Sequence, residues 1–504
     1  MTSDNLSALV RRAAERVPAK PALLYQDRQL TWGDLEQQVR RVAAALRSLG
    51  LAPGDRVALA LGNTPAFPSC YFGALRAGLV AVPVNPGSTA AELRHVLGDS
   101  GAAALIGQRG LAATCAVLAS ELPSLRHVVS AGDDAPAGVL VLADLLAGAE
   151  PSTESIGSSE DLAVLMYTSG TSGRPRGAML THRALLANLE QCSRIAPAVM
   201  SGDDVVLLVL PLFHIYGLNA ALGMVAWHGA TGVLIERFDP VETLNVMQQH
   251  QVSNVVGAPP MYVAWSLLPD VGEAFTHVRL AVSGAAPLAP EVLGRFLDAT
   301  GHHVFEGYGL TETAPVLAST LMSAVAKPAS IGRAIPGVEL RLLDDAGEPV
   351  QEEDPGEITV RGANLFSGYW PDGEGGPDPD GWFRTGDVAY ADEDGDVHIV
   401  DRRRELILVS GFNVYPREVE DVLARHPGIA EAAVIGIAHP YTGESVKAVV
   451  VLRSGVQLTS EDVMQHCAGQ LASFKCPTSV AFVAQLPHSA IGKTAKGQLR
   501  ESAG

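Results

Sequence analysis

The chain has 504 residues, of which 47% are hydrophobic and 18% are charged. This length allows more than one domain, and this composition is that of a folded globular protein rather than a disordered one. The formal net charge of −19 makes non-specific binding to nucleic acid or to anionic lipid unfavourable. Because the same charge repels polyanions such as nucleotides, a nucleotide site in this chain needs local positive charge or Mg²⁺.

Five cysteines are scattered along the chain without a CxxC pair. An odd, dispersed set argues against a disulfide framework or a zinc site and favours a reducing cytoplasm. The first twenty residues lack the apolar core that a secretory signal needs. The most apolar stretch, residues 205–227, contains Pro211, His214 and Asn219, so we expect a buried strand, a loop and a helix there rather than a membrane span.

The opening 150 residues alternate helical patterns with short apolar runs. Residues 30–50 have apolar positions at helical spacing and end on Gly50, which predicts a helix that stops at that glycine. Residues 56–63 and 79–85 predict buried strands, with a helix between them. From this rhythm we expect parallel sheets covered by helices, with ligands bound at the carboxyl ends of the strands. The rhythm continues in the apolar runs at 205–212, 231–236, 252–260 and 279–288.

From about Ser330 the pattern changes to short runs broken by DDAG and DEDG turns, which predicts a β-rich segment. After Asp401 a smaller unit begins. Its sequence predicts a helix at 416–426, strands at 432–438 and 447–452, and a final helix with a tail. The chain is therefore expected to belong to the α/β class, with a β-rich part and a small α+β unit at its end.

Two segments have turn-like sequences without a predicted site. The acidic run 391–399 resembles a calcium loop in charge, but it lacks the twelve-residue ligand pattern and the terminal bidentate glutamate. We therefore expect a hairpin turn at Asp394-Gly395 and assign it no metal. The segment 373–381, GEGGPDPDG, is expected to form a short exposed connection rather than a domain linker.

The strongest local signal is the segment YTSGTSGRPRG, Tyr167 to Gly177. Glycines let a backbone approach phosphate oxygens closely, and hydroxyl side chains donate hydrogen bonds to them. The Walker spacing is absent, and GKT at 492–494 lacks the first glycine of that motif because Pro487 stands there. Taken alone, the segment is as typical of a solvated loop as of a phosphate site. The hydroxyls are those of Thr168, Ser169, Thr171 and Ser172.

Six further motifs follow in order: PLFHIYG, SGAAPL, EGYGLTET, GWFRTGD, DRRRELILVSGFNVYPREVE and LPHSAIGK. With YTSGTSGRPRG, they make the chain resemble the acyl-adenylate-forming superfamily, which includes acyl-CoA synthetases, beetle luciferases and the adenylation domains of peptide synthetases. Stand-alone acyl-CoA synthetases are the most similar members. The resemblance spans nearly the whole chain. It implies an N-terminal acyl- and ATP-binding domain, residues 1–401, with a β-barrel-like subdomain, and a small mobile catalytic domain, residues 402–504.

The resemblance implies a two-step reaction. A carboxylate oxygen attacks the α-phosphorus of ATP, pyrophosphate leaves and an acyl-adenylate remains; coenzyme A then takes the acyl group and AMP is released. Positioning and charge stabilisation provide most of the catalysis in such transfers. The implied ligands are ATP, Mg²⁺, coenzyme A and a carboxylic acid.

The matching motifs imply which residues hold ATP. Thr311 contacts the α-phosphate, and Glu312 binds Mg²⁺. Asp387 accepts both ribose hydroxyls with help from Arg402, although Asp387 taken alone is typical of a turn. The β- and γ-phosphates are held by the loop that contains Thr168, Ser169, Gly170, Thr171, Ser172 and Arg176. The adenine slot is formed by Gly284, Ala285, Gly307 and Tyr308.

Lys493 is implied to be the catalytic lysine, whose ammonium stabilises charge that develops on the reacting oxygens. Taken alone it is typical of an exposed lysine. His214 taken alone is typical of a core histidine, but the resemblance implies that it opens or closes the acyl pocket in the second step. The small domain then rotates about Arg404, so that Ser410 and Gly411 line the coenzyme A tunnel.

Three residues depart from the pattern of the family. Arg176 stands where the phosphate loop usually has lysine; it keeps the charge but has a forked geometry. Arg404 stands at the hinge, where lysine or aspartate is common, and is expected to permit the rotation. Leu408 stands where luciferases and plant aromatic-acid ligases have a second functional lysine, which disfavours a luciferase-type oxidation.

The acyl pocket is predicted to be apolar and to contain small residues. Adenylation domains of peptide synthetases place an aspartate at the start of the pocket segment, whereas PLFHIYG has no carboxylate, so an amino acid substrate is disfavoured. A neutral fatty, aromatic or polycyclic acid would fit, and a dicarboxylic acid would need a cation that the sequence does not identify. The predicted wall consists of His214, Val255, Val256, Gly257, Ala258, Gly284, Ala286, Gly309 and Val316.

Coenzyme A is the expected acceptor because no carrier domain is fused to the two predicted domains. Transfer to the phosphopantetheine of a separate carrier protein is the alternative. A non-catalytic nucleotide-binding regulator is a third interpretation, and it is disfavoured because mere binding does not need Lys493 and Glu312. No nucleic-acid partner is expected.

Overall fold

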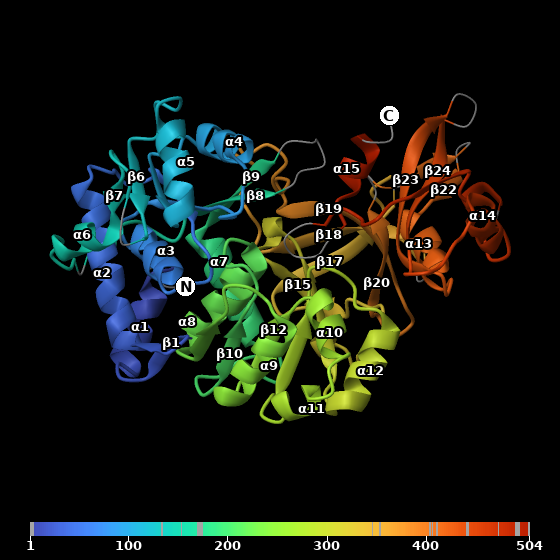
Figure 1. Cartoon of the computed structure of the whole chain (residues 1–504), viewed down its shortest axis with the longest axis horizontal. Helices are drawn as coiled ribbons and strands as arrows, with labels where there is room; N and C mark the ends of the chain where they lie inside the picture. The colour runs from blue at the N-terminus through green and yellow to red at the C-terminus, as the bar shows by residue number, and fades with distance from the viewer. Residues whose placement is uncertain are drawn as a thin grey trace. The chain divides into compact units, whose positions relative to one another are not determined.

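The computed structural model describes residues 5–132, 135–152, 154–168, 175–344, 346–351, 354–402, 405, 407–409, 412–439, 443–471, 473–488 and 494–501. Figure 1 shows its elements, coloured along the chain. The chain divides into two compact units. Unit 1 consists of Met1–Pro328, Gly332–Glu339 and Arg361–Phe383, and unit 2 consists of Ala329–Ile331, Leu340–Val360 and Arg384–Gly504.

Unit 1 contains a seven-stranded sheet that is parallel except for its last pair of strands. Strands β3 and β4 confirm the two buried strands that the sequence predicts near the N-terminus. The last pair is antiparallel and places Thr168 opposite Arg176. In sheet order the strands are β7 (Leu140–Val141), β6 (His127–Ser130), β5 (Ala104–Gly107), β3 (Arg56–Ala60), β4 (Val80–Pro83), β8 (Leu162–Thr168) and β9 (Arg176–Thr181).

A nine-stranded sheet forms the second layer of unit 1. Its six central strands are parallel, and antiparallel strands lie at both edges. The four later apolar runs of the sequence become β10, β11, β12 and β13, as predicted. In sheet order the strands are β16 (Arg333–Ala334), β15 (Val316–Ser319), β14 (Val304–Gly309), β13 (Leu280–Ser283), β12 (Asn254–Gly257), β10 (Val205–Leu208), β11 (Thr231–Leu234), β1 (Pro21–Tyr25) and β2 (Arg28–Thr31).

Helix α2 (Trp32–Ser48) shows how the sequence sets the helices of unit 1. The side chain of Thr31 accepts from the amide of Asp34, and the Asp34 carboxylate accepts from the amide of Thr31, so two free donors at the helix start are satisfied. The helix ends before Gly50, whose φ of +74° confirms the predicted stop. Val42 lies against Gly73 of α3 (Ala66–Arg76), where an added Cβ would come within 2.4 Å of its side chain.

Ten other α-helices belong to the described part of unit 1. Figure 1 shows α9 to α12 beside the nine-stranded sheet and α4 and α5 beside the seven-stranded one. Their bounds are α1 (Ala8–Arg16), α4 (Ala90–Ser100), α5 (Arg109–Ala119), α6 (Leu142–Ala147), α7 (His182–Ser193), α8 (Met224–His228), α9 (Pro240–Gln249), α10 (Pro259–Trp265), α11 (Val271–Ala274) and α12 (Pro290–Thr300).

A four-stranded sheet, most of which belongs to unit 2, confirms the β-rich segment. Its strands are β17 (Val338–Leu343), β18 (Gly356–Gly362), β19 (Trp382–Ala391) and β20 (Val397–Arg402). The acidic run forms the predicted hairpin: β19 and β20 are antiparallel, and Gly395 has a φ of +81°. One carboxylate oxygen of Asp392 accepts from the amides of Asp394 and Asp396 at 3.1 and 3.0 Å, so its charge holds the turn.

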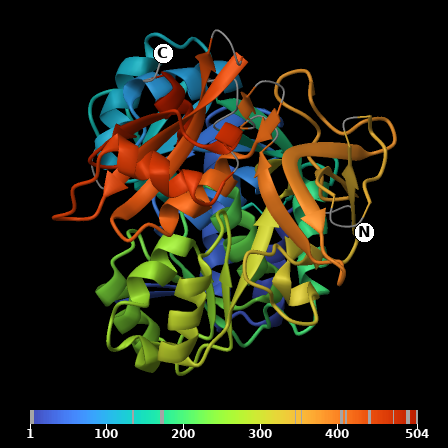
Figure 2. The same ribbon diagram turned by 90° about the vertical axis from the view of Figure 1, so that its right-hand side faces the viewer.

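Unit 2 also contains a five-stranded sheet packed against two helices, of which the sequence predicts one helix and two strands. Val419 and Leu423 of α13 (Pro416–Ala424) and Val463 of α14 (Ser460–Ala468) are buried in one core with the sheet. The ribbon of this part of the chain is drawn in red in Figure 2. The strands are β22 (Phe412–Val414), β21 (Ile407–Val409), β24 (Gly443–Leu452), β23 (Ile429–His439) and β25 (Ser479–Phe482), and α15 (Lys496–Glu501) follows.

The apolar stretch 205–227 forms strand β10, a loop, the π-helix η1 (Tyr216–Gly223) and most of α8. This is the strand, loop and helix that the sequence predicts. Within the described residues, no helix is long and apolar enough to cross a membrane.

The cysteines are free thiols inside the two units. Cys70, Cys115, Cys192 and Cys467 are buried, and Cys476 is partly buried. Burial raises the pKa of Cys70 and Cys192 to about 12 and that of Cys115 and Cys467 to about 11. A thiolate is therefore disfavoured at each of these positions.

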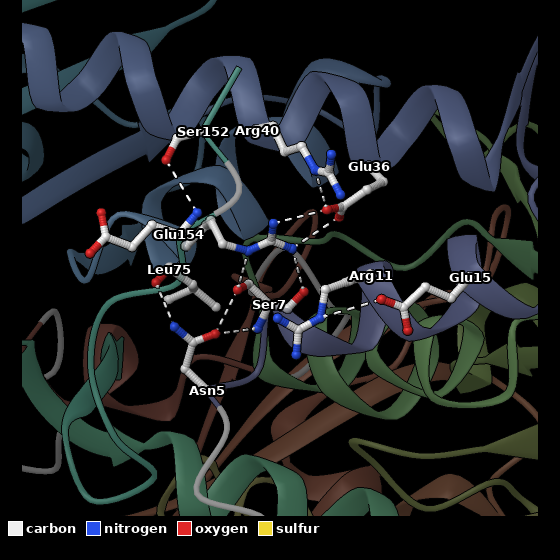
Figure 3. A network of polar contacts seen from close by, with 10 residues as sticks. Asn5, Ser7, Arg11, Glu15, Glu36, Arg40, Leu75, Ser152 and Glu154 are labelled. Carbon is white, nitrogen blue, oxygen red and sulfur yellow. Dashed lines mark hydrogen bonds and ion pairs between the residues drawn. The ribbon is translucent and has the colours of Figure 1, made fainter. Parts of the chain in front are cut away.

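A buried ion pair joins the N-terminal segment to helices α2 and α3 (Figure 3). The guanidinium of Arg76 donates to both carboxylate oxygens of Glu36 at 3.0 and 2.9 Å, and its other donors reach the hydroxyl and carbonyl of Ser7. Arg76 is 1% and Glu36 is 5% exposed. Arg40 adds a second cation at 2.8 Å from Glu36. The full set of hydrogen bonds compensates the desolvation of both charges.

We predict that Glu36→Ala lowers the free energy of unfolding by about 3–5 kcal/mol, because it leaves the Arg76 charge buried without a partner. Urea unfolding followed by circular dichroism measures the change. The control is Glu339→Ala, which removes an ion pair with Arg361. In this pair the side chain of Glu339 is 60% exposed and that of Arg361 is 43% exposed. Its expected loss is below about 1 kcal/mol. Equal losses in the two variants would contradict the prediction.

Candidate active site

Several predicted site residues of unit 1 lie at the carboxyl ends of neighbouring parallel strands. Gly257 ends β12 and pairs with Ser283, the last residue of β13, and Ser283 pairs with Glu306 of β14. Gly284 therefore follows directly on β13, and Gly307 lies within β14, one residue after the partner of Ser283. Ligands of open α/β sheets bind at this edge, so the location of a ligand site here stays a prediction with which this arrangement of strands agrees.

The segment PLFHIYG forms a tight turn after strand β10. The amide of His214 donates to the carbonyl of Pro211 at 3.1 Å, and the carbonyl of His214 accepts from Leu218 at 2.8 Å. An added Cβ at Gly217 would lie 2.4 Å from the carbonyl oxygen of Pro211. The turn therefore requires glycine at 217, and it fixes the backbone that carries His214.

His214 is a neutral imidazole near pH 7. Its Nδ1 accepts a hydrogen bond from the amide of Tyr216 at 3.2 Å, which leaves the proton on Nε2. Desolvation lowers its pKa from 6.5 to about 4. His182 has the same shift, to about 4, but is 2% exposed, and its Nδ1 accepts from the amide of Leu6. A low pKa thus marks burial at both positions and does not by itself distinguish a functional histidine.

The ring of Tyr216 lies across Gly284. An added Cβ at Gly284 would come within 2.8 Å of the phenol oxygen and the adjacent ring carbon, so only glycine leaves room for this contact. The next residue, Ala285, has a φ of +72°, a left-handed conformation that costs about 1 kcal/mol or more outside glycine. The carboxylate of Glu306 accepts from the amide of Leu288 at 3.0 Å and so secures the far end of this loop.

Glu312 lies in the short 3-10 helix η2 (Thr311–Thr313), between β14 and β15. It is 8% exposed, and its Oε1 accepts a hydrogen bond from the phenol of Tyr369 at 2.5 Å. Its backbone carbonyl accepts from the amide of Phe366 at 2.9 Å. The turn brings Gly309 so close to Pro315 that an added Cβ would lie 1.7 Å from the proline carbonyl oxygen.

Buried amide side chains hold the residues that follow Glu312. Asn188 accepts from the amide of Val316 and donates to its carbonyl, at 3.1 and 2.8 Å. Asn219 donates to the carbonyl of Ala314 at 2.7 Å. Asn364 donates to the carbonyl of Thr313 at 2.7 Å. The three asparagines are at most 1% exposed.

Arg176 begins strand β9, after the glycine- and hydroxyl-rich loop. Its guanidinium lies over the ring of Tyr369, with the central carbon 3.9 Å from the ring centroid. The same tyrosine donates to Glu312. The structure therefore brings together two predicted ATP-site residues, Arg176 and Glu312, through a third residue that the sequence motifs do not include.

In unit 2, Asp387 is 4% exposed and lies on β19 directly opposite Arg402 of β20. Its amide donates to the hydroxyl of Thr385 at 3.2 Å. The structure thus places the two predicted ribose-binding residues on paired strands. Leu408, which the sequence marks as a departure from luciferases, lies in β21.

Several predicted residues lie outside the described part of the chain. They belong to the phosphate loop, the hinge, the coenzyme A tunnel and the catalytic lysine motif, and their roles stay predictions: Ser169, Gly170, Thr171, Ser172, Arg404, Ser410, Gly411 and Lys493.

A single buried carboxylate suits Mg²⁺, which binds one or two carboxylates and otherwise takes phosphate and water oxygens. Glu312 has this character, because it is 8% exposed and its Oε1 accepts a hydrogen bond from a neutral phenol. Within the described residues, no group of three or more histidine, cysteine, aspartate or glutamate side chains could hold a metal by itself. The donor set therefore fits a metal that arrives with a phosphate ligand.

The sequence analysis did not identify Tyr369 or the asparagines that hold the turn. Tyr369 lies in GANLFSGYW, a segment without a predicted function, just before the predicted exposed connection. Asn188 lies in α7 and Asn219 lies in the π-helix η1. A single asparagine within a helix does not change the apolar periodicity, so the sequence pattern did not mark either residue. Only the spatial arrangement shows what these side chains contact.

Comparison with known families gives two matches that cover most of the chain. Residues 10–370 match the model of the AMP-binding enzyme family, and residues 418–493 match that of the AMP-binding enzyme C-terminal domain. The long-chain-fatty-acid–CoA ligase of Yersinia pestis is 36% identical and covers 99% of this chain and 95% of its own length. The feruloyl-CoA synthase of an Amycolatopsis species is 38% identical over the full length of both chains.

A solved structure shows the same fold. ATP-bound MatB from Rhodopseudomonas palustris superposes with a TM-score of 0.90 at 33% identity, over 99% of each chain. This similarity confirms the predicted fold class, with a large domain of helix-covered sheets, a strand-rich part and a smaller α+β domain.

We predict that His214→Asn flattens the dependence of stability on pH in acid. The pKa of His214 is lowered in the folded state, so the unfolded state binds the proton more readily, and wild-type stability falls as the pH drops from about 6.5 toward about 4. In the variant, the slope of the free energy of unfolding against pH should be smaller by up to about 1.4 kcal/mol per pH unit. Urea unfolding at several pH values in this range measures it, and equal slopes for the two proteins would contradict the prediction.

Proposed function

Because the chain belongs to the family of AMP-binding enzymes, we propose that it is an ATP-dependent acyl-CoA synthetase of the AMP-forming type. The observation that carries the proposal is the buried Glu312, joined through one tyrosine to Arg176 at the end of the phosphate loop. Similarity over the full chain to a long-chain-fatty-acid–CoA ligase and a feruloyl-CoA synthase supports coenzyme A as the acceptor. The carrier-protein alternative has no comparable support.

In the first step, the carboxylate of the acid attacks the α-phosphorus of ATP and pyrophosphate leaves. Glu312 would hold Mg²⁺, which supplies positive charge at the phosphate oxygens when bound. Arg176 and the loop residues from Thr168 onward bind the β- and γ-phosphates, and Thr311 orients the α-phosphate. Lys493 stabilises the negative charge that develops on the reacting oxygens.

Further residues of the proposed site orient the nucleoside. Gly284, Ala285, Gly307 and Tyr308 accommodate adenine, and an added Cβ at Gly307 would meet open space among the described residues. Asp387 accepts the two ribose hydroxyls, with Arg402 on the paired strand beside it.

In the second step, the thiol of coenzyme A attacks the acyl carbonyl and AMP leaves. Residues 402–504 form the domain that rotates about Arg404 and replaces the Lys493 face with the face of Ser410 and Gly411. The imidazole of His214 is neutral, so its ring can rotate out of the pantetheine path without breaking an ion pair. The backbone turn that carries His214 stays in place.

The proposed substrate is a neutral acid with a fatty or aromatic body. Val256 is 6% exposed, and the rings of Tyr262 and Tyr216 lie against Gly257 and Gly284, so the wall predicted from the sequence contains apolar and aromatic side chains. The two relatives named above act on long-chain fatty acids and on ferulate, which are acids of this kind. The five free thiols fit a reducing compartment, and we place the reaction in the cytoplasm.

The decisive experiment supplies ATP, Mg²⁺ and coenzyme A with a panel of fatty, hydroxycinnamic, benzoic, dicarboxylic and amino acids. We expect AMP, pyrophosphate and an acyl-CoA with at least one neutral acid, and none with amino acids, because the segment PLFHIYG has no carboxylate to pair with an α-ammonium group. Mass spectrometry of the thioester and chromatography of the nucleotides give the answer. Formation of ADP and phosphate without AMP would overturn the proposal.

Lys493→Ala is predicted to reduce acid-dependent exchange of pyrophosphate into ATP by about 10²–10³ or more, because a charge stabiliser of the transition state is removed. Thioester formation from a pre-made acyl-adenylate should be nearly unchanged. Equal loss in both half-reactions would assign Lys493 a different role.

The complementary variant for this experiment is Gly411→Leu. A bulky side chain in the tunnel should block pantetheine, so pyrophosphate exchange is retained while thioester synthesis is lost. A melting scan shows whether the small domain stays folded. A folded Gly411→Leu variant with normal thioester synthesis would contradict rotation of this domain.

A further inference from the structure

Tyr369 lies in a segment that is fastened to the strand after the phosphate loop. Three backbone hydrogen bonds attach residues 367–370 to β9: the amide of Met179 donates to Gly368 at 3.0 Å, that of Ser367 to Met179 at 2.9 Å, and that of Trp370 to Gly177 at 2.8 Å. The position of Tyr369 relative to Arg176, the first residue of β9, is therefore set by paired backbone.

The tyrosine is also fixed from its other side. Its amide donates to the carbonyl of Glu374 at 3.0 Å, and its carbonyl accepts from the amide of Gly373 at 2.8 Å. The ring of Phe366 meets its ring edge-to-face at 5.1 Å. An added Cβ at Gly375 would lie 3.2 Å from the ring. The connection that the sequence predicts to be merely exposed thus closes over Tyr369.

The two ends of the side chain have different partners. The ring face carries the guanidinium of Arg176 at 3.9 Å, and the hydroxyl donates to Oε1 of Glu312 at 2.5 Å. Among the described residues, Arg176 and Glu312 each contact Tyr369 rather than form an ion pair with each other. The aromatic ring keeps the cation and the carboxylate apart, although their charges attract, and leaves the second carboxylate oxygen without a bond to the phenol.

We propose that Tyr369 is a positioning residue that holds Arg176 and Glu312 at a fixed separation, so that both face one metal–triphosphate ligand. This inference rests on the proposed function of the site. A direct ion pair would neutralise both groups and withdraw them from the ligand. The tyrosine prevents that pairing. Its neutral hydroxyl donates to the carboxylate of Glu312, and the face of its ring binds the guanidinium of Arg176.

The same arrangement explains why arginine rather than lysine stands at 176. A planar, delocalised guanidinium stacks on an aromatic ring and still directs its edge donors at phosphate oxygens. A lysine ammonium is a compact, strongly hydrated charge and cannot do both in this way. Arg176 and Tyr369 should therefore act as a pair.

The first test measures binding of Mg²⁺ and ATP to the whole enzyme by calorimetry, without acid or coenzyme A. Tyr369→Phe keeps the stacked ring and removes the hydroxyl. It should weaken Mg²⁺-dependent ATP binding by about tenfold, the equivalent of one hydrogen bond to a charged group. The melting temperature should stay near that of the wild type, since one hydroxyl is removed and the ring remains. Unchanged Mg²⁺-dependent binding in a folded variant would overturn the proposal.

The second test is a double-mutant cycle. Arg176→Lys alone should weaken ATP binding, whereas Arg176→Lys should add little in the background of Tyr369→Leu, because the stacking partner is already lost. Additive effects would overturn the pairing. If Tyr369→Leu fails to fold, the same cycle with Tyr369→Phe is decisive, because the stacked ring remains there. Arg176→Lys should then weaken ATP binding as much as it does in the wild type, on top of the weakening of about tenfold caused by loss of the hydroxyl, and a smaller effect of Arg176→Lys would overturn the pairing.

The matched control is Tyr25→Phe. Tyr25 of β1 also donates to a glutamate, Glu236, at an exposed position. Its replacement should change neither Mg²⁺-dependent ATP binding nor the KM for ATP in pyrophosphate exchange. A wild-type enzyme that binds no ATP would refute the proposed function itself, whereas normal ATP binding by Tyr369→Phe would refute only the role of Tyr369. If Tyr25→Phe weakened Mg²⁺-dependent ATP binding as much as Tyr369→Phe, the loss would reflect general destabilisation, and the proposed role of Tyr369 would be overturned.

Discussion

The turn that carries Glu312 depends on hydrogen bonds from neutral, buried amides. The side chains of Asn364, Asn219 and Asn188 donate to three backbone carbonyls of this turn. These carbonyls belong to Thr313, Ala314 and Val316, in that order. Each such bond contributes only about 1 kcal/mol net, but a buried carbonyl left without a partner costs about 1–3 kcal/mol. The turn includes a left-handed alanine at 314, with a φ of +64°. The amides make this strained path the favoured one.

Neutral amides also suit a site that must receive a highly charged ligand. A fixed ion near the turn would compete with the metal or with the phosphates for Glu312, whereas an amide holds the backbone without adding net charge. The buried ion pair of Arg76 and Glu36 lies elsewhere, where it joins the N-terminal segment to α2 and α3. In unit 1 a buried ion pair thus joins the N-terminal segment to two helices, whereas neutral amide side chains hold the turn that carries Glu312.

Periodicity and motifs predicted most of the framework. The helix at 30–50, the strands before each glycine-rich loop and the hairpin at Asp394-Gly395 have local causes, so the sequence was sufficient. The role of Tyr369 was not predictable, because its partners at positions 176 and 312 are far away in sequence. The same holds for Asn188, whose bond to Val316 spans 128 residues. Predictions for Lys493 and Gly411 rest on the motifs alone.

The buried thiols make this enzyme convenient for chemical labelling. Disulfide reagents react with thiolates, and the four buried cysteines have both a raised pKa and little access to solvent. The pKa of Cys476 is raised as well. A cysteine introduced on an exposed loop of either unit would therefore react much faster than the four buried thiols. Fluorophores could be attached there without first replacing the natural cysteines, and free coenzyme A could be titrated with little background from the protein.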